Sequence, residues 1–546
     1  MKRKRSTACT AAATALLLLS ACKGAGASER ASDGVLRIGD TGSTISTLNP
    51  FVASNVFELA IFRYVYPHLV QYGTGSEIEG DFASSYDASA DGLTWTFHTR
   101  PGAKWSDGKD LTAEDAAWTF QQILAHKDGP TARLASYLQH VTKVEAGGKD
   151  ELTVTLDAPL ATALSQISQV PILPRQVWQE PLSGDASQLK NFTNDAPLVS
   201  GGSFILTDQK KGAFALFKAN SNFYGRKPKL KGFGLQFFGS ADAMVTVLRQ
   251  GQIDVAYDVP ATAAKTLKAE PSLDLLTTSG MDEDFLIFNS SSGQRAHPEL
   301  LEPKVREAFH LAIDRKKLVD VVTLGMGAAA TSVIPPSLAP WYDPATGAEG
   351  LDVASANSIL DGLGFARGSD GIRIANGHPM AYELLQPTGL TGHDRVVDLV
   401  RADLAAIGVK VTPKIVDGDA FGQLLVTPSE KAPSYDLAMD DWVSKRDPDF
   451  MLSLFTCAQI GNRNEGAYCS QDYEALYNQQ ATTLDSGARR DAVVKAQQFL
   501  DKEKPWIPQF ANPNIIAVNK KVKGFNGSPF VIDHTSRHQI DDVRLG

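Results

Sequence analysis

The side chains best suited to holding a ligand by charge and by stacking lie in one short stretch, DDWVSKRDPDF, at residues 440–450. Trp442 offers a large amphipathic ring beside a proline-containing loop, and charged groups follow it closely. A binding loop is the functional interpretation of this stretch. The alternative is a solvated charged loop whose tryptophan belongs to the core.

Motifs that carry covalent chemistry are absent from the sequence. It has no Gly-x-Ser-x-Gly elbow, no His-Glu-x-x-His helix, no Cys-x-x-Cys pair and no phosphate-binding loop. Its ten histidines are scattered, and the close pair His534 and His538 is expected to be solvated rather than metal-binding. We therefore expect no enzyme activity, no cofactor and no metal site. A secreted hydrolase whose site escapes such motifs stays the alternative from a different class.

The N-terminus has the three parts of a secretory signal. Basic residues occupy positions 2–5, an apolar segment spans 11–19, and small residues lead to Cys22. The apolar segment is far shorter than the ~20 residues of a membrane-spanning helix. The letters LSAC at residues 19–22 resemble a bacterial lipobox, whose cysteine becomes lipidated; an ordinary signal peptide is the alternative. We expect a protein on the outer face of the cytoplasmic membrane, held there only by its lipid anchor.

Length and charge limit the possible classes of protein. The chain has 546 residues, enough for about three domains, and 43% hydrophobic residues, as an ordinary globular protein has. Its net charge is −9, and since the charged residues of the signal are all basic, removal of the signal would make the net charge more negative. This acidic balance argues against binding to nucleic acid and against electrostatic docking on anionic lipid.

Two cysteines, Cys457 and Cys469, lie close together in the rest of the chain. Outside the cell such a pair is expected to form a disulfide, which would stabilise the fold by roughly 3 kcal/mol for so short a loop. Two buried thiols are the first alternative. A two-ligand metal site is the second, although no histidine is near in sequence.

The elements that would position these groups alternate between strand and helix patterns. In GLTWTFHT, Leu93, Trp95 and Phe97 alternate with polar residues, as in a strand with one buried face. Thr112 and Asp115 form a capping-box variant that predicts a helix beginning at about residue 113. The stretch ELTVTLDAP predicts another half-buried strand.

Later segments repeat this vocabulary. We predict a helix before Gly251 and a short strand at residues 253–257, one helix over 303–325, a strand in AIGVKVTPKIV and a helix ended by Pro505. The helix over 303–325 would have an apolar face formed by Val305, Ala308, Phe309, Ala312 and Ile313. Together these features predict an α/β protein.

Seven stretches of the sequence resemble motifs of the family 5 extracellular solute-binding proteins, the peptide and nickel receptors of ABC importers, and they occur in the same order as in that family. They are TWTFHTRPGAKWSDGKDLTAEDAAWTF, PILPRQVW, NSNFYGRKPKL, LRQGQIDVA, FLIFNSSS, KVREAFHLAIDRKKLV and DWVSKRDPDF. The resemblance covers nearly the whole mature chain. A modest departure is SGGSF at residues 200–204, where the family usually has a Gly-Thr-Gly-Pro-Tyr turn.

The resemblance implies a fold of the periplasmic-binding-protein type, with two α/β lobes joined by a hinge and an inserted third domain. The expected ranges are 1–21 for the lipoprotein signal peptide and 22–34 for the lipidated cysteine and tether. Lobe I is expected to comprise 35–66, 201–285 and 506–546, the inserted domain 67–200, and lobe II 286–505. Ligand would lie between the lobes, and closure around it would be a hinge motion.

The resemblance also implies where ligand binds. In relatives that bind peptides, a tryptophan at the place of Trp442 lines the pocket, and an aspartate three residues later holds the peptide's amino terminus. That position is Lys445 here, so either an alignment gap makes Asp447 the anchor or the carboxylate is missing. The candidate ligand-binding residues are Asp441, Trp442, Lys445, Arg446, Asp447, Asn289, Thr44, Asn49 and Phe51.

The function implied is reversible capture of a small ligand, foremost an oligopeptide, and its delivery to the permease subunits of an ABC importer. The protein is expected to be a monomer that binds no nucleic acid. A sensor of peptide signals with the same fold is the nearest alternative. Capture of nickel or a metal chelate is allowed by the family but supported by no ligand cluster in the sequence.

Overall fold

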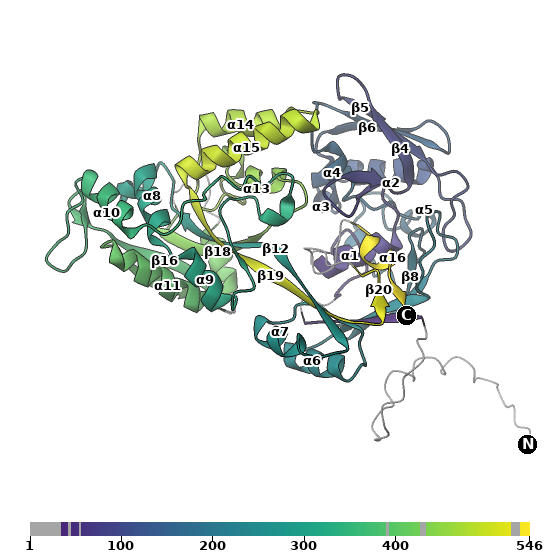
Figure 1. Cartoon of the computed structure of the whole chain (residues 1–546). Coiled ribbons are helices and arrows are strands. Elements are labelled where there is room, and N and C mark those ends of the chain that lie inside the picture. Colours follow the sequence, from purple (N-terminus) through teal and green to yellow (C-terminus); the bar gives the residue numbers. More distant parts are fainter. Residues whose placement is uncertain (1–33, 42–44, 54–55, 389–391, 426–432, 526–535) are drawn as a thin grey trace, which may run out of the picture. The chain divides into compact units, whose positions relative to one another are not determined.

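The computed structural model describes residues 34–41, 45–53, 56–388, 392–425, 433–525 and 536–546. Eleven of its strands form one mixed sheet in the order β17-β16-β18-β12-β19-β11-β1-β10-β9-β8, with β13 pairing to β19 (Figure 1). The strands of this sheet are β1 (Val35–Asp40), β8 (Phe204–Lys210), β9 (Phe214–Ala219), β10 (Gly232–Phe237), β11 (Val255–Ala256), β12 (Leu273–Phe288), β13 (Ala328–Ala329), β16 (Ala381–Pro387), β17 (Lys410–Val416), β18 (Leu437–Val443) and β19 (Trp506–Asn519).

Two long antiparallel strands, β12 and β19, run through the middle of the sheet. They pair from Leu273 opposite Asn519 to Ile287 opposite Trp506, with register shifts that begin after Ser279. The second part of β12 also pairs with β18, whereas the far end of β19 pairs with β11. The two strands therefore join the two halves of the sheet (Figure 1).

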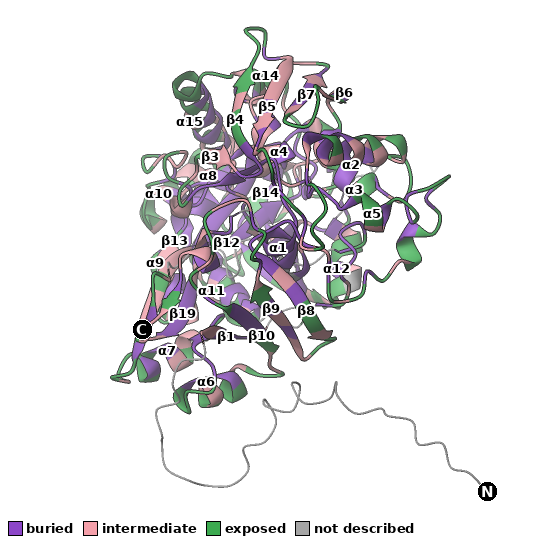
Figure 2. Ribbon diagram, turned by 90° about the vertical axis from the view of Figure 1, so that its right-hand side faces the viewer, coloured by how far each residue is buried: buried purple, intermediate pink, exposed green. Residues whose placement is uncertain are grey.

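The second part of β12 is covered on both faces. Phe285 and Ile287 belong to one hydrophobic core, and Leu286 and Phe288 belong to another. In Figure 2 the buried residues lie along the sheet, and the exposed ones gather on outer loops and outer helix faces. A strand that is buried on both faces has a continuous run of apolar residues, and this explains the sequence FLIF at residues 285–288. Since side chains alternate along a strand, neighbours on β12 face different cores.

Different helices cover these two cores. The core of Leu286 is covered by α8 (Pro303–Ala312), α9 (Arg315–Val322), α10 (Val353–Gly362) and α11 (His393–Ala406). The core of Phe285 is covered by α12 (Gly418–Leu425), α13 (Asp449–Ser453), α14 (Gln471–Thr482) and α15 (Ser486–Glu503). The remaining α-helices are α1 (Val56–Val65), α2 (Ala113–Ala125), α3 (Ala132–Ala135), α4 (Ala163–Ile167), α5 (Arg175–Trp178), α6 (Ala241–Arg249), α7 (Ala261–Leu267) and α16 (His538–Asp541).

A separate four-stranded sheet has the order β4-β5-β7-β6. Its strands are β4 (Ala83–Ala88), β5 (Thr94–Thr99), β6 (Val141–Ala146) and β7 (Glu151–Leu156). The predicted strands of this region are confirmed, and β7 buries every second residue. The predicted helix start is confirmed as well, because α2 begins at Ala113 and the backbone N–H of Thr112 donates to Asp115 Oδ2 at 2.9 Å. Short two-stranded pairs are β2–β3 (Val70–Tyr72, Ile78–Gly80), β14–β15 (Ile374–Ala375, His378–Pro379) and β20–β21 (Val522–Lys523, Arg544–Leu545).

The single helix predicted over 303–325 is wrong, because the structure has two helices there, α8 and α9. Ile313 leaves the helix with an extended backbone. The carboxylate of Asp314 then accepts a hydrogen bond from the backbone N–H of Lys317 at 2.9 Å and caps the second helix. An aspartate is among the best N-capping residues, so its local hydrogen bond competes with continuation of the first helix.

The other predicted elements are confirmed with adjusted bounds. Helix α6 ends just before Gly251, whose φ is +69°, and the strand predicted at 253–257 is shorter, at β11. The predicted strand after residue 406 is β17, and the helix before Pro505 is α15. Within the described ranges, no helix has the length and apolar character that a membrane crossing requires.

One of the predicted domain boundaries falls inside a strand of this architecture. The four-stranded sheet lies inside the predicted range 67–200. The predicted boundary at residue 285 falls within β12, because one long strand contributes to both halves of the large sheet. The boundaries therefore stay a prediction, and the predicted signal segment with Cys22 lies outside the described residues.

Candidate ligand-binding site

Trp442 lies near the end of β18, half-buried on the face of the sheet that α13, α14 and α15 cover. Its indole Nε1 donates a hydrogen bond to Glu465 Oε2 at 3.2 Å. The ring lies nearly parallel to that of Trp506 with centroids 6.5 Å apart, and 5.8 Å from the ring of Phe450. Trp442 thus has features of both interpretations, because it packs against the core as a structural residue would and remains partly accessible as a binding residue would.

Arg446 contacts a segment far away in the sequence. Its guanidinium donates hydrogen bonds to the backbone oxygens of Gly73, at 3.0 Å, and Gly75. It also lies 5.6 Å from the centre of the Tyr72 ring, and Arg446 itself is 7% exposed. The loop after β18 is therefore bound to the chain around the β2–β3 pair.

Lys445 makes a second contact of this kind. Its Nζ lies 4.6 Å from the ring centre of Phe450 in its own loop and 5.6 Å from that of Tyr137. Both rings attract the ammonium group by cation–π interaction. Lys445 and Arg446 together join residues 444–447 to the predicted inserted domain.

Asp447, the alternative anchor for an amino group, is paired within the protein. Its two oxygens accept hydrogen bonds from Arg489 Nη1 and Nη2 at 2.9 and 2.6 Å, and one also accepts from the backbone N–H of Asp449. Burial lowers the pKa of Arg489, but the charge and hydrogen bonds of Asp447 raise it, and the pKa of Arg489 lies above its usual value. Its role toward ligand stays a prediction, since a ligand amine would compete with a bidentate guanidinium.

Three carboxyl groups gather on the Trp442 face of the sheet. Glu283 pairs across the strands with Trp442, and Asp440 pairs with Phe285 on the same face. Glu283 is 1% exposed, and neither of its oxygens has a hydrogen-bond partner among the described residues. Glu465, which is 5% exposed, accepts from Trp442 and lies within hydrogen-bonding reach of Asp440.

Burial dominates the protonation of these groups. It raises the pKa of Glu283 well above its ordinary range, and the charges of Asp282 and Asp284 raise it further. Burial, Glu465 and Asp441 raise the pKa of Asp440 in the same way. Burial raises the pKa of Glu465 to about 8, against the opposing hydrogen bonds of Trp442 and Asp440. A positive charge placed among these groups would hold them ionised.

The opposite face holds the predicted residue Asp441 with Asp282 and Asp284. Asn512 Nδ2 donates to Asp282 at 3.2 Å and to Asp284 at 3.0 Å. His393 Nε2 lies 3.0 Å from Asp284 Oδ1. Burial lowers the pKa of His393, but the hydrogen bond and charge of this carboxylate raise it, and the pKa of His393 lies above its usual value. This group is therefore partly neutralised by the protein's own polar side chains.

The remaining predicted residues lie apart from this cluster. Asn49 is fully buried, and its amide donates to the Leu189 backbone oxygen at 2.7 Å. Phe51 is 4% exposed and packs edge-on against Trp178 at 5.5 Å, whereas Thr44 lies outside the described residues. These positions make internal contacts, and their contact with ligand stays a prediction.

Asn289 follows the last residue of β12, at the opposite end of the β12–β18 pair from Trp442. Its side-chain amide donates to the backbone oxygens of Tyr435 at 2.9 Å and Pro433 at 3.2 Å, and the residue is 1% exposed. The predicted amide donor is thus engaged by the chain that leads into β18.

Sequence reasoning missed Glu283, Asp440 and Glu465. The run Asp-Glu-Asp at 282–284 stands immediately before an apolar strand, an unusual place for three charges and a signal that could have been used. Glu465 has no such signal, since it reaches the site from a loop. That loop lies between Cys457 and Cys469, which form a disulfide in the structure.

Comparison with known proteins identifies the class of protein. The chain belongs to the bacterial extracellular solute-binding proteins of family 5, whose middle-region model matches residues 77–462. It is 24% identical over 498 residues to heme-binding protein A of Haemophilus influenzae, covering 86% of each chain. It is 30% identical over 427 residues to protein XP55 of Streptomyces lividans, covering 76% of this chain and 72% of that one.

Solved structures agree in fold. The oligopeptide-binding protein AppA from Bacillus subtilis, in complex with a nonapeptide, has a TM-score of 0.72 at 20% identity, covering 94% of this chain and 98% of that one. NikZ from Campylobacter jejuni, in complex with Ni(L-His), has a TM-score of 0.74 at 19% identity, covering 94% and 99%. The predicted α/β fold of the periplasmic-binding-protein type is confirmed. The protein is a solute-binding receptor of the extracellular space, in a family of receptors rather than enzymes.

Proposed function

We propose that this receptor captures oligopeptides through their amino terminus and delivers them to the permease of an ABC importer. The observation that carries the proposal is the group Glu283, Asp440 and Glu465 beside Trp442. Glu283 supplies two buried oxygens without a hydrogen-bond partner among the described residues. Relatives named as di/tripeptide-binding and glutathione-binding proteins support a peptide-like ligand.

A peptide ammonium group fits the chemistry of these carboxyls. A buried carboxylate is costly unless it is paired, and a ligand cation that ionises it gains a charge-assisted hydrogen bond in return. The indole of Trp442 adds an apolar wall on which a side chain or peptide plane can lie. In this proposal the carboxylate that peptide-binding relatives have three residues after the tryptophan is replaced by Glu283 and Asp440 on the sheet and Glu465 on a loop.

Access to this group requires movement. In the conformation described, the carboxyls are shielded from water, and residues 444–447 are bound to residues 72–75 and Tyr137. Separation of the two lobes would expose the group, and closure around a bound peptide would favour the closed state. The permease would then distinguish loaded receptor from empty receptor.

The finer parts of the proposal concern location and assembly. We propose that Cys22 is lipidated and that residues 23–32 tether a monomeric receptor to the membrane. A tether raises the effective concentration of receptor near its permease. Signalling peptides would be bound in the same manner as nutrients.

The test begins with native mass spectrometry of the protein purified from cells, to identify a co-purified peptide. Calorimetry would then compare this peptide with its N-acetylated form. We expect acetylation to weaken binding at least about 30-fold, because it removes a buried charge pair worth ~2 kcal/mol or more. Equal affinity of the two forms, or a co-purified sugar, would overturn the proposed ligand.

The matched variants are Glu283→Gln and Glu307→Gln. Glu283→Gln keeps the shape of the side chain and should weaken the free peptide without weakening the acetylated one. Glu307 pairs with Lys304 on the surface of α8, so its replacement should leave both affinities unchanged. Loss of affinity for both peptides in Glu283→Gln would point to a packing role instead.

A further inference from the structure

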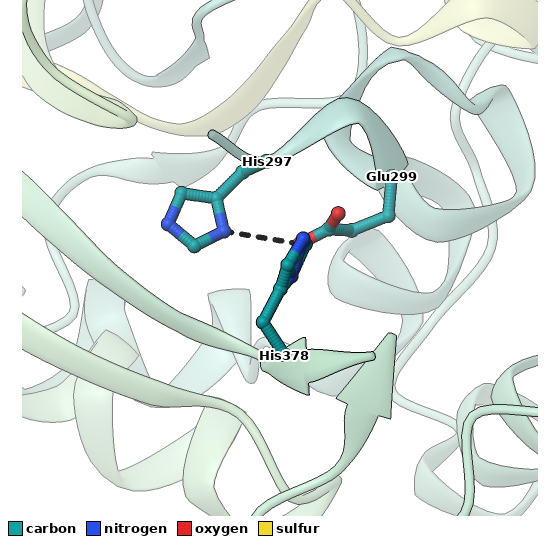
Figure 3. A group of neighbouring side chains, drawn as sticks. All are labelled: His297, Glu299 and His378. Atoms are coloured by element: carbon teal, nitrogen blue, oxygen red, sulfur yellow. Dashed lines mark hydrogen bonds and ion pairs between the residues drawn. The ribbon is translucent and has the colours of Figure 1, made fainter. Parts of the chain in front are cut away.

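A group of metal-ligating side chains lies away from the Trp442 cluster. His297 and Glu299 belong to the turn at residues 297–301, and His378 belongs to the β14–β15 hairpin. One ligand atom from each side chain lies within 4.8 Å of the others. Figure 3 shows the two rings and the carboxylate turned toward one another.

Glu299 is a buried carboxylate without a permanent cation as partner. It is 1% exposed and accepts from Tyr382 Oη at 2.9 Å and from Asn376 Nδ2 at 3.3 Å. Its ion-pair contact is His297 Nδ1 at 3.2 Å, and no lysine or arginine of the described residues pairs with it. A buried carboxylate held by neutral donors retains an uncompensated charge, which a bound cation would neutralise.

His378 contributes an imidazole nitrogen that the protein does not use. Its Nδ1 is shielded from water and has no hydrogen-bond partner among the described residues. The ring lies edge-on to His297, with centroids 5.6 Å apart. A buried imidazole nitrogen without a hydrogen-bond partner would be satisfied by a metal ion when the ring proton is on the other nitrogen.

A carboxylate lies on the far side of His297. While Nδ1 faces Glu299, Nε2 lies 3.9 Å from Asp436 Oδ2. Asp436 is itself oriented by the backbone N–H of Glu383, which donates to it at 2.9 Å. Once within hydrogen-bonding distance, a carboxylate in this place would fix the orientation of a metal-bound ring.

We propose that His297, Glu299 and His378 bind one divalent transition-metal ion of the zinc class. Two imidazoles and one carboxylate suit Zn²⁺ and its neighbours rather than Mg²⁺ or Ca²⁺. Bonds of about 2.0–2.1 Å would draw the ligand atoms to about 3.3 Å from one another, a contraction that rotation of two half-buried rings supplies. Water fills the fourth position.

This ion would act on the fold and not on the peptide. It would connect the turn before α8 to the β14–β15 hairpin, beside the first residue of β18. The Trp442 cluster lies toward the other end of β18, so loss of the ion should leave the peptide site in place. The proposal is therefore independent of the ligand proposed above.

The test measures Zn²⁺ alone on the purified chain after treatment with a chelator. Competition with a chromogenic chelator should give one Zn²⁺ per chain, and the ion should raise the melting temperature. His378→Gln should weaken binding at least 10-fold while leaving the melting temperature of the metal-free protein unchanged, because its Nδ1 bonds nothing. Glu299→Gln should also weaken Zn²⁺ binding.

The control is His140→Gln, which replaces an exposed histidine that pairs with Asp157 at 2.9 Å and should bind Zn²⁺ as the unmodified protein does. X-ray absorption of the Zn²⁺ complex should show two imidazoles in a shell of nitrogen and oxygen. Absence of binding, or unchanged affinity in His378→Gln, would overturn the site. Loss of binding in His393→Gln instead would assign the ion to Asp284 and contradict the proposal.

Discussion

Two acidic residues of the candidate site have opposite surroundings. Asp447 gives both oxygens to the Arg489 guanidinium, whereas Glu283 has no hydrogen-bond partner for either oxygen among the described residues. A carboxylate with a bidentate partner stabilises the fold, and removing one member of such a buried pair costs about 3–5 kcal/mol. A buried carboxyl without a partner is costly to ionise in the empty protein, and under the proposed function a ligand ammonium group would supply the missing partner.

At this scale the first prediction concerns pH. Burial raises the pKa of Glu465 from 4.5 to about 8, so the folded state keeps a proton that the unfolded state releases. The stability contributed by this proton is complete below pH 4.5 and is lost as the pH rises toward 8. We expect the melting temperature of ligand-free protein to fall by several degrees between pH 5 and pH 8.

Thermal melts of Glu465→Gln provide the check, since the amide does not titrate and the fall should become shallower. Glu145→Gln, on an exposed side chain that pairs with Lys143, should keep the original slope. Identical slopes in all three proteins would show that Glu465 does not carry the effect.

At the scale of elements, the long strand β12 brings the site together because it contributes to both halves of the large sheet. Both parts of β12 pair with β19, and its second part also places Glu283 opposite Trp442 on β18. The register shift after Ser279 lies just before the three acidic residues. Bulges of this kind redirect side chains, and they are frequent next to functional sites.

The second prediction concerns the break between α8 and α9. Replacing Asp314 by Ala removes the carboxylate that caps α9 and should lower the free energy of unfolding by about 1 kcal/mol. The backbone N–H of Asp314, which donates to Asp403 at 3.1 Å, remains in the variant. Urea unfolding measures the change. Asp314→Ser retains a capping oxygen and should lose much less, and equal losses would mean that the cap is not the cause.

At the scale of the whole molecule, residues 444–447 connect parts of the chain that are distant in sequence. Arg446 and Lys445 bind the chain near Gly73 and Tyr137, while the same loop continues β18 into α13. The loop beside Trp442 is thus also a contact between the predicted lobe II and the predicted inserted domain. Ligand binding and lobe closure would share these residues, as a closing receptor requires.

The third prediction follows from this contact. Arg446→Ala removes the hydrogen bonds to Gly73 and Gly75 and should shift the ligand-free protein toward an open form. Small-angle scattering should then show a larger radius of gyration, and the affinity for peptide should fall about 10-fold if closure loses ~1.4 kcal/mol. Arg490→Ala changes an exposed arginine beside Arg489 and should leave both quantities unchanged. A radius of gyration that stays constant in Arg446→Ala would contradict the closing role.

The sequence by itself determined the local structure and the family of this protein. Alternation in ELTVTL, the pair Thr112 and Asp115, and the end of a helix at Pro505 each depend on a few neighbouring residues, so they could be read directly. It also placed Trp442 within a few residues of Lys445, Arg446 and Asp447, although the structure puts Trp442 in β18 and the other three in the loop after it. The prediction of one helix over 303–325 was wrong because the helical spacing of apolar residues continues past Asp314, where the structure begins a second helix.

Only the tertiary structure decided which charges face one another. Asp447 accepts hydrogen bonds from Arg489, Glu283 lies opposite Trp442, and His297 lies beside His378, although the members of each pair are dozens of residues or more apart in the sequence. The physical reason is that strand register and helix packing set these distances, and both depend on the whole fold. A local pattern specifies the conformation of its own backbone but not the distant side chain that will complete a site.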